Sequence, residues 1–405
     1  MRTTRLAAGG IAALLGAVAV PVCAQDIGAP VSLSDGVTVD PLLAARVRYE
    51  TVDQARQPDP AQALTVRARI GAELKAAGFS LLAESEGTLA LADDYNDTLP
   101  GNGVEPFPTV ADPESFELNR LQVSYFRDGA GITLGRQRIV LDNARFVGNV
   151  GWRQNEQTFD AVRGQARFGP VAIDGSYAMS QRTVFGSDSP NAHYDGDFVL
   201  LNAGFDLAAV DAKAFAYLLD YDERVGFSSQ TYGVLVTAAI DWPRLGKLDL
   251  LASHAVQRDY GTNPVAYQAE YWNAQLSLGL AGFTVTAGYE ELGSDRGRAA
   301  FQTPLATLHA FNGWADLFLT TPANGLRDRY AGIARSLPFL PGFKAELIYH
   351  EFDSDVGGID YGREWDAALA FRLGAVNLLA KYAHYDAGGF GSDTEKLWLQ
   401  AEVTF

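Results

Sequence analysis

Cysteine is almost absent from this sequence. The 405 residues contain one cysteine, Cys23, and two methionines. A single thiol forms no internal disulfide framework and supplies no set of thiolate metal ligands. Cys23 also falls in a leader that we expect to be removed. The sequence therefore predicts a mature chain without disulfides, a thiolate metal site or a cysteine nucleophile.

Basic residues are in the minority. The chain has 32 Lys and Arg against 49 Asp and Glu, and its formal net charge is −17. Because phosphate recognition depends on excess Lys and Arg, we expect no nucleic acid partner. The five histidines lack a metal-ligand spacing or an obvious serine partner, so we predict no catalytic residue, no metal site and no cofactor. They are His193, His254, His309, His350 and His384.

Long apolar runs are confined to the first two dozen residues. Arg2 and Arg5 precede an apolar run from Leu6 to Val22, and the small-residue triplet 22–24 ends before Gln25. This layout predicts a cleaved signal peptide over residues 1–24. Beyond it no run of about 18 apolar residues occurs, so the sequence predicts no membrane-spanning helix.

A two-residue alternation of apolar and polar residues runs through the rest of the chain. From Leu64 to Leu74, one parity is entirely apolar and the other is polar or glycine. Such a segment predicts a strand with one apolar face, because a helix would scatter the arginines over conflicting faces. About eighteen segments of roughly 9 to 13 residues share the pattern, which is the length of a tilted strand that crosses a bilayer.

The connections between these segments alternate in length. Short turns near 77–78, 128–129, 169–170, 208–209, 243–244, 281–282, 340–341 and 374–375 alternate with longer polar stretches such as 93–114, 141–157 and 293–325. Short periplasmic turns and long external loops are typical of bacterial outer-membrane barrels. We therefore predict one all-β domain over residues 25–405, a transmembrane antiparallel β-barrel of eighteen strands, with sixteen as the alternative.

The last segment supports the same interpretation. Leu397, Leu399, Ala401, Val403 and Phe405 share one parity. The segment resembles the C-terminal strand of outer-membrane proteins, whose last aromatic residue is read by the barrel assembly machinery. The predicted location is the bacterial outer membrane, with outer-membrane lipid and lipopolysaccharide around the barrel.

If the apolar parity faces lipid, the opposite parity lines the lumen. In the first half of the chain that parity is rich in arginine, and guanidinium groups in a narrow pore would attract anions. Carboxylates such as Glu73, Glu84 and Asp174 are interleaved with them, so pairing across the wall is an equally weighted alternative. The basic residues are Arg46, Arg48, Arg67, Arg69, Lys75, Arg120, Arg163, Arg167 and Arg182.

Two longer stretches carry a family resemblance. One runs from Leu134 to Asn149 and continues from Trp152 to Ala161; the other runs from Phe301 to Asp316 and continues to Asp328. Both resemble the alginate-export domain family, whose founding member is an eighteen-stranded outer-membrane porin. The motifs cover about a sixth of the chain. This chain is shorter than that porin, and its second half lacks an equally dense set of arginines.

The resemblance implies a pore constricted by arginines that select carboxylates. It implies Arg136, Arg138, Arg145, Arg153, Asp160 and Arg163 as constriction residues, beside Arg67, Arg69 and Arg120 from the lumen parity. The segment 293–325 is too long and too apolar for a free loop tip, so we expect it to pack inside the barrel or over its mouth.

Three functions are compatible with this sequence. The leading prediction is a passive, monomeric channel for a hydrophilic solute, an anionic or neutral saccharide or polysaccharide, with no enzymatic activity. The second is an outer-membrane lipase or protease, for which His254 and His384 on the apolar parity are the only hint. The third is a structural barrel closed by its own loops.

Overall fold

The computed structural model describes residues 28–207, 209–242, 246–337 and 339–405. The predicted signal peptide, residues 1–24, lies outside the described residues, as do residue 208 of the turn predicted at 208–209 and the whole turn predicted at 243–244. No helix of the described part is long and apolar enough to cross a membrane. Two short 3-10 helices, η2 (Val225–Phe227) and η3 (Leu308–Ala310), interrupt the loops.

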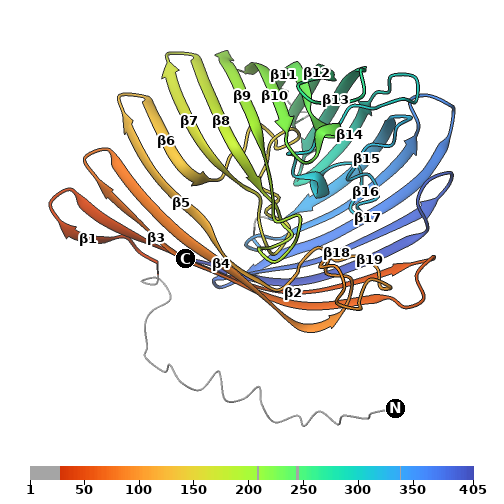
Figure 1. Cartoon of the computed structure of the whole chain (residues 1–405), viewed down its shortest axis with the longest axis horizontal. Coiled ribbons are helices and arrows are strands. Elements are labelled where there is room, and N and C mark those ends of the chain that lie inside the picture. Colours follow the sequence, from red (N-terminus) through yellow and green to blue (C-terminus); the bar gives the residue numbers. More distant parts are fainter. Residues whose placement is uncertain (1–27, 208, 243–245, 338) are drawn as a thin grey trace, which may run out of the picture.

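Eighteen antiparallel strands form one closed wall (Figure 1). The fold class and the strand number predicted from the alternation are confirmed, and the sixteen-strand alternative is wrong. A short additional strand, β1 (Val31–Ser34), pairs with the beginning of β2. The wall strands are β2 (Val37–Gln54), β3 (Ala61–Ala76), β4 (Phe79–Asp94), β5 (Ser115–Arg127), β6 (Ala130–Gln137), β7 (Thr158–Phe168), β8 (Val171–Arg182), β9 (His193–Leu207), β10 (Val210–Tyr221), β11 (Ser229–Trp242), β12 (Gly246–Asp259), β13 (Gln268–Leu280), β14 (Phe283–Leu292), β15 (Leu326–Ser336), β16 (Lys344–Asp353), β17 (Asp360–Leu373), β18 (Val376–Ala387) and β19 (Thr394–Thr404).

The alternation sorts side chains between the two faces of the wall. Ile70 on β3 is 65% exposed, whereas its neighbours on the other parity include Arg67, which is 1% exposed. Tyr177, Tyr232 and Trp365 are likewise exposed on the outer face. Apolar side chains that would be costly in water are favourable in a lipid bilayer, so the outer surface suits a membrane.

Two-residue turns join several pairs of neighbouring strands at one end of the barrel. Ala77 and Gly78 both have positive φ angles, 50° and 87°, and the pair Asp128–Gly129 repeats this geometry with 52° and 84°. Positive φ at both central residues matches the right-handed twist of the flanking strands. Glycine at the second position adopts it without steric cost.

The seam between the first and last wall strands closes the ring. β19 pairs with β2 from Thr394 opposite Gln54 to Thr404 opposite Ala44. The Phe405 amide extends this ladder by donating to the Leu43 carbonyl at 2.8 Å. Closure leaves no unpaired strand edge at this position, which a bilayer requires.

Candidate pore constriction

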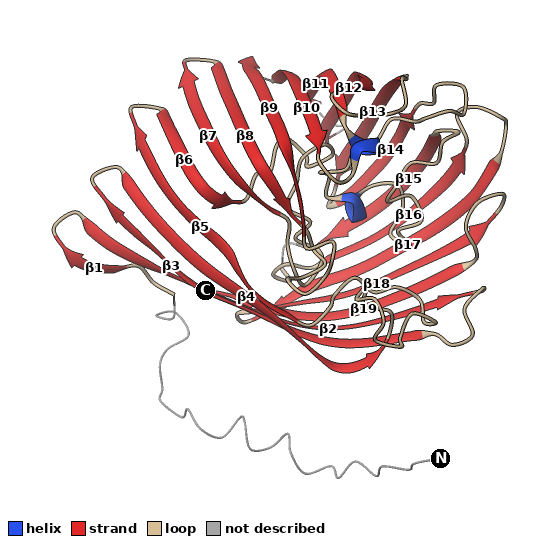
Figure 2. Ribbon diagram, in the orientation of Figure 1, coloured by secondary structure: helices blue, strands red, loops and turns tan. Residues whose placement is uncertain are grey.

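Two long connections cross the interior of the barrel (Figure 2). Loop 138–157 follows β6, and loop 293–325 follows β14. They meet at a parallel bridge between Val147 and Leu305, where the Gly148 amide donates to the Leu305 carbonyl at 2.8 Å. We call the two loops together the internal plug.

Apolar side chains give the plug its own core. Ile139, Val147, Phe301 and Leu305 are each at most 1% exposed and belong to one buried cluster. Each such side chain contributes about 1.5–3 kcal/mol when it is fully removed from water. The apolar side chains of these loops therefore pack inside the barrel rather than at its surface.

Arg145 fastens the plug to the wall. Its Nε donates to Glu290 of β14 at 2.7 Å, and its remaining nitrogens donate to Thr303 at 2.8 Å and Asn312 at 3.1 Å. The Arg145 side chain is 2% exposed and that of Glu290 is 3% exposed. A buried guanidinium and carboxylate that compensate each other this fully form a tether.

Arg153 forms a second tether on another part of the wall. Its guanidinium donates to Glu50 of β2 at 3.3 Å and to Asp316 of loop 293–325 at 3.1 Å. Lys396 of β19 also donates to Asp316, at 3.0 Å. Burial opposes the charged form of Arg153, but the carboxylates of Glu50, Asp112 and Asp316 outweigh it and raise the pKa of Arg153 above its ordinary value.

His309 lies at the centre of this contact. Its ring stacks on Trp152 with centroids 4.4 Å apart. Lys381 of β18 donates to its Nε2 at 2.7 Å, and its Nδ1 lies 2.8 Å from Asp316. Burial lowers the pKa of His309 to about 3 despite the Asp316 carboxylate. The ring is therefore neutral, with Nδ1–H donating to Asp316 and Nε2 accepting from Lys381.

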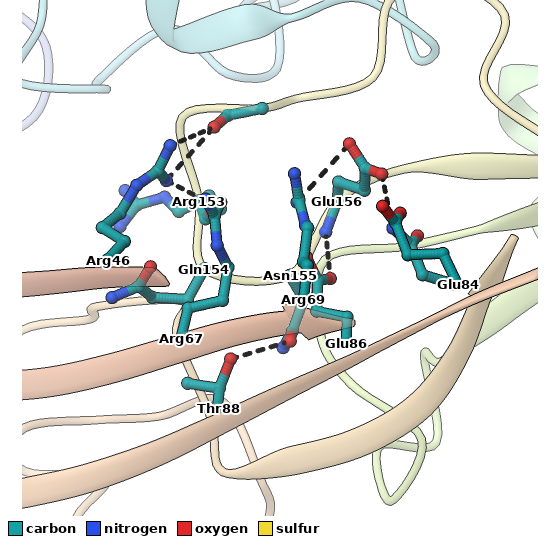
Figure 3. A network of polar contacts seen from close by, with 12 residues as sticks. Arg46, Arg67, Arg69, Glu84, Glu86, Thr88, Arg153, Gln154, Asn155 and Glu156 are labelled. Carbon is teal, nitrogen blue, oxygen red and sulfur yellow. Dashed lines mark hydrogen bonds and ion pairs between the residues drawn. The ribbon is translucent and has the colours of Figure 1, made fainter. Parts of the chain in front are cut away.

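Arginines of β2 and β3 form a column along the lumen face of the wall (Figure 3). Arg46 and Arg67 lie directly opposite each other on neighbouring strands. Arg48 and Arg69 extend the column in the two directions along the barrel. We call Arg46, Arg48, Arg67 and Arg69 the arginine column.

Backbone carbonyls of the plug accept hydrogen bonds from this column. Arg46 donates to the carbonyls of Gly151, Trp152 and Arg153 at 3.0–3.2 Å. Arg48 donates to the Trp152 carbonyl at 2.5 Å, and its guanidinium lies 4.1 Å from the centroid of the Trp152 ring. The column thus positions residues 151–153 in the lumen.

Carboxylates compensate one end of the column and its neighbours. Arg69 bonds Glu86, and Arg138 donates to Glu156 at 2.5 Å. Arg120 binds Glu84 with two hydrogen bonds of 2.9 and 2.8 Å. Such pairs brace the wall, which is the alternative that the interleaved charges predicted.

Several guanidinium N–H groups of the column have no hydrogen-bond acceptor. Among the described residues these are the buried Nε of Arg46, Nη1 of Arg48, Nε and Nη1 of Arg67 and Nη2 of Arg69. Carboxylates lie near two of them, because Asp112 is 3.6 Å from Nη1 of Arg48 and Glu156 is 3.5 Å from Nη2 of Arg69. Glu402 forms ion pairs with Arg46 at 3.1 Å and with Arg67 at 2.7 Å, so two guanidinium groups share one carboxylate. Buried unpaired donors on cations favour an added acceptor, above all an anion.

The structure brings most of the predicted site residues together. Arg163 faces the lumen away from the column and pairs with Asp174. Arg136 and Asp160 pair with each other at 2.8 Å on the parity of the exposed Leu134, so they lie on the outer face of the wall and outside the constriction. Arg67, Arg69, Arg120, Arg138, Arg145 and Arg153 lie in or beside the polar network between plug and wall.

The sequence reasoning missed Lys381 and Lys396. Lys381 follows the lumen parity of β18, next to the outward Tyr382, and that parity was the available signal. Its ammonium lies 3.6 Å from the centroid of Trp314 and 4.5 Å from that of Trp152. Both lysines therefore join the contact between plug and wall.

Cavities remain on both sides of the plug. One of 550 Å³ is lined by Arg153, Lys396 and residues of the loop between β8 and β9. Others of 530 Å³, 460 Å³ and 420 Å³ lie between the plug and the turn-bearing end of the barrel. The 530 Å³ cavity is lined by Lys75, Arg138 and Arg163. The arginine column runs along the wall between the cavity that contains Arg153 and the cavity that contains Arg138.

The fold is similar to that of solved outer-membrane porins. Pseudomonas aeruginosa OccK9 (OpdG) aligns with a TM-score of 0.71 at 15% identity, over 91% of this chain and 98% of that one. P. aeruginosa OpdK with vanillate aligns with a TM-score of 0.70 at 14% identity and the same coverage. Acinetobacter baumannii OccAB4 has a TM-score of 0.71 at 12% identity, again over 91% and 98%.

No family model matches the sequence, and no curated protein matches it. The resemblance to the alginate-export domain family is therefore not confirmed. At 12–15% identity the solved structures show the shared barrel architecture.

Proposed function

We propose that this chain is a non-enzymatic channel of the bacterial outer membrane that passes small solutes carrying a carboxylate. The observation that carries the proposal is the set of guanidinium N–H groups without a hydrogen-bond acceptor on Arg46 and Arg67, which share one carboxylate, Glu402, in the lumen. Fixed cations in a narrow, partly dehydrated passage lower the energy of an anion and raise that of a cation. The apolar outer face supports the location in a membrane.

A small carboxylate is the preferred substrate class. One structural neighbour, OpdK, was solved with vanillate, which carries a carboxylate. One cavity beside the plug measures 550 Å³, within the range of about 300–1,000 Å³ usual for small-molecule sites. This size favours a monomeric acid, including a single uronate, over the alginate polymer that the sequence motifs suggested.

Reconstitution in planar bilayers tests the proposal. We expect discrete ionic conductance, a reversal potential that indicates anion preference in a salt gradient, and concentration-dependent block by benzoate or glucuronate. A cation-selective channel would contradict the role given to the arginine column.

A structural barrel closed by its own plug is the second candidate. The tethers of Arg145 and Arg153 favour it, because both are buried and fully compensated. It predicts no conductance in the intact protein and none after removal of residues 296–322 of loop 293–325. Conductance in the intact protein supports the channel instead.

An outer-membrane hydrolase has less support. His254 lies on the outer face, where its ring is 4.0 Å from that of Trp272 and its Nε2 is 3.6 Å from Glu270. These contacts include no serine hydroxyl. We propose as partners the surrounding lipid and lipopolysaccharide, the barrel assembly machinery and the solute, with a monomer as the functional unit.

A further inference from the structure

A second kind of cavity lies on the opposite side of the lumen from the arginine column. It measures 420 Å³ and lies between residues 310–314 of the plug and the lumen faces of β12 to β16. Its polar lining is dominated by side-chain amides and hydroxyls, among them Asn273, Gln275, Thr284 and Thr286. We call this space the amide cavity.

One buried acceptor in the amide cavity has no partner. Asn273 is 8% exposed, and its Nδ2 donates to the Tyr271 hydroxyl at 3.0 Å and to Glu290 at 3.1 Å. Its Oδ1 has no donor among the described residues. A buried amide oxygen without a donor is costly, so a ligand hydroxyl that reached it would gain a hydrogen bond that the protein lacks.

An aromatic ring forms part of the wall beside this acceptor. A Cβ atom at Gly288 would lie 2.2 Å from Cζ of Tyr330, so the absence of a side chain at Gly288 lets the ring lie across β14. The Tyr330 hydroxyl donates to Gln275 Oε1 at 2.8 Å, which fixes the ring. Phe311 and Trp314 of the plug also line the cavity.

The charges of the amide cavity are compensated internally. Glu290 binds Arg145 at 2.7 Å, and Asp328 lies 2.9 Å from Nδ1 of His350. Glu346 binds Lys344, which is the only Lys or Arg in the described lining, at 2.7 Å. The arginine column, by contrast, carries four guanidinium groups, two of which share the single carboxylate of Glu402.

We propose that the amide cavity binds a neutral polyhydroxylated solute of monosaccharide size. Such a solute offers hydroxyls that both donate and accept, as Asn273 Oδ1 and the amides and hydroxyls of the wall require, and C–H faces that pack on an aromatic ring. The binding site stands on this geometry, whereas a role of the site in transport rests on the proposed channel function. The barrel then holds two sites of different chemistry, one for anions and one for neutral solutes.

Three sugars of equal size but different charge test the proposal. Binding of glucose, glucosamine and glucuronate to the purified mature protein is measured by calorimetry in detergent, and block of the ionic current by each is measured in bilayers. We expect glucose to bind in the amide cavity and glucuronate to block at the arginine column. Undetectable glucose binding to the wild-type protein overturns the proposal, and so does glucosamine binding tighter than glucose binding, because it would indicate a cation site.

Gln275→Leu is the informative variant, and Gln165→Leu is its matched control. Gln165 also faces the lumen but lies away from the amide cavity, where it binds Asp174. We expect Gln275→Leu to weaken glucose binding about fivefold to tenfold, the equivalent of one net hydrogen bond, and to leave glucuronate block unchanged. Glucose binding that is equal in Gln275→Leu and in wild type, or that Gln165→Leu weakens equally, overturns the proposal.

Gly288→Ala provides an independent test of the aromatic wall. The added methyl group displaces Tyr330, so glucose affinity falls without loss of any polar group from the cavity; unchanged affinity counts against the proposal. Retention of the heat-modifiable folded band in electrophoresis identifies the variants that assemble. Glucose binding without conductance refutes the channel and keeps the site, whereas conductance without Gln275-dependent glucose binding refutes the site and keeps the channel.

Discussion

The lumen has two walls that contact the same plug in opposite ways. On β2 and β3 the wall supplies hydrogen-bond donors, and the backbone carbonyls of plug residues 151–153 accept from them. On β17 the wall supplies hydrogen-bond acceptors. In the plug, the Trp314 amide donates to Asp366 at 3.2 Å and the Ala315 amide donates to Glu364 at 2.7 Å. Neutral backbone groups therefore bind both walls, and each wall retains its own charge. The arginine side is left with unused donors, which suits an anion.

Removing the guanidinium of Arg145, which compensates a buried carboxylate of the acidic wall, is expected to have the largest effect on stability. Arg145→Ala leaves Glu290 buried without its main counter-charge and should lower the free energy of unfolding by about 3–5 kcal/mol. The temperature at which the folded band is lost in electrophoresis measures this change. The control is Arg327→Ala, because the Arg327 side chain is 38% exposed and pairs with Glu291 and Asp355 near solvent; we expect at most about 1 kcal/mol. Equal effects of the two substitutions would show that Arg145 is not a tether.

The second largest effect is expected from lowering the pH, which should reduce stability through protonation of His309. The folded-state pKa is about 3, whereas the ordinary value is 6.5. Below pH 6.5 the unfolded chain takes up a proton that the folded chain does not, so the free energy of unfolding falls as the pH falls. Between pH 6.5 and pH 5 we expect a loss of roughly 1–2 kcal/mol that is absent in His309→Gln. Equal slopes of the two pH profiles, measured by the same electrophoretic transition, would show that folding does not shift the pKa of His309.

Neutralising the arginine side is expected to change selectivity more than stability. Arg46→Gln with Arg67→Gln removes two guanidinium groups that bear unpaired donors, so the ratio of anion to cation permeability should fall about fivefold. Reversal potentials in a salt gradient measure the ratio. Arg163→Gln is the control, because Asp174 compensates that charge. A ratio unchanged in the double variant would place anion selection elsewhere in the lumen.

Glu402→Gln should increase the anion preference of the channel, and we expect this effect to be the smallest of the four. The substitution removes the carboxylate that Arg46 and Arg67 share and leaves both guanidinium groups in place. We expect the anion preference to rise about twofold and the block by benzoate to occur at lower concentration. A fall in anion preference would indicate that Glu402 positions the arginines for the solute.

The sequence predicted the wall far better than the contents of the lumen. Strands such as Ala61–Ala76 follow from alternation alone, because the period of a strand fixes which side chains meet lipid. Alternation also bears on Arg136, which shares the parity of Leu134 and lies on the outer face, although the family resemblance implied a constriction role. The local pattern was the better guide at that position.

The contacts of the plug could not be predicted from spacing. Arg145 and Glu290 are separated by 145 residues, and Val147 and Leu305 meet across a comparable distance in sequence. Register shifts at Leu64/Thr65, Glu84/Ser85 and Asp160/Ala161 further alter which residues lie opposite each other. Such bulges leave little trace in a hydrophobic pattern, so partners of individual arginines required the folded barrel.

The seam between β19 and β2 has a consequence for how the molecule is made. Trp398 on β19 lies opposite Glu50 on β2, so the two strands that close the barrel are far apart in the sequence. Neighbouring strands can pair early, but β2 can pair with β19 only after β19 has been synthesised, and pairing between strands so distant in sequence is slow. A chain truncated before Thr394 would lack β19 and would leave strand edges on β2 and β18 unpaired in the bilayer, where no water can satisfy their backbone groups. We expect such a chain to be degraded rather than to form a smaller pore.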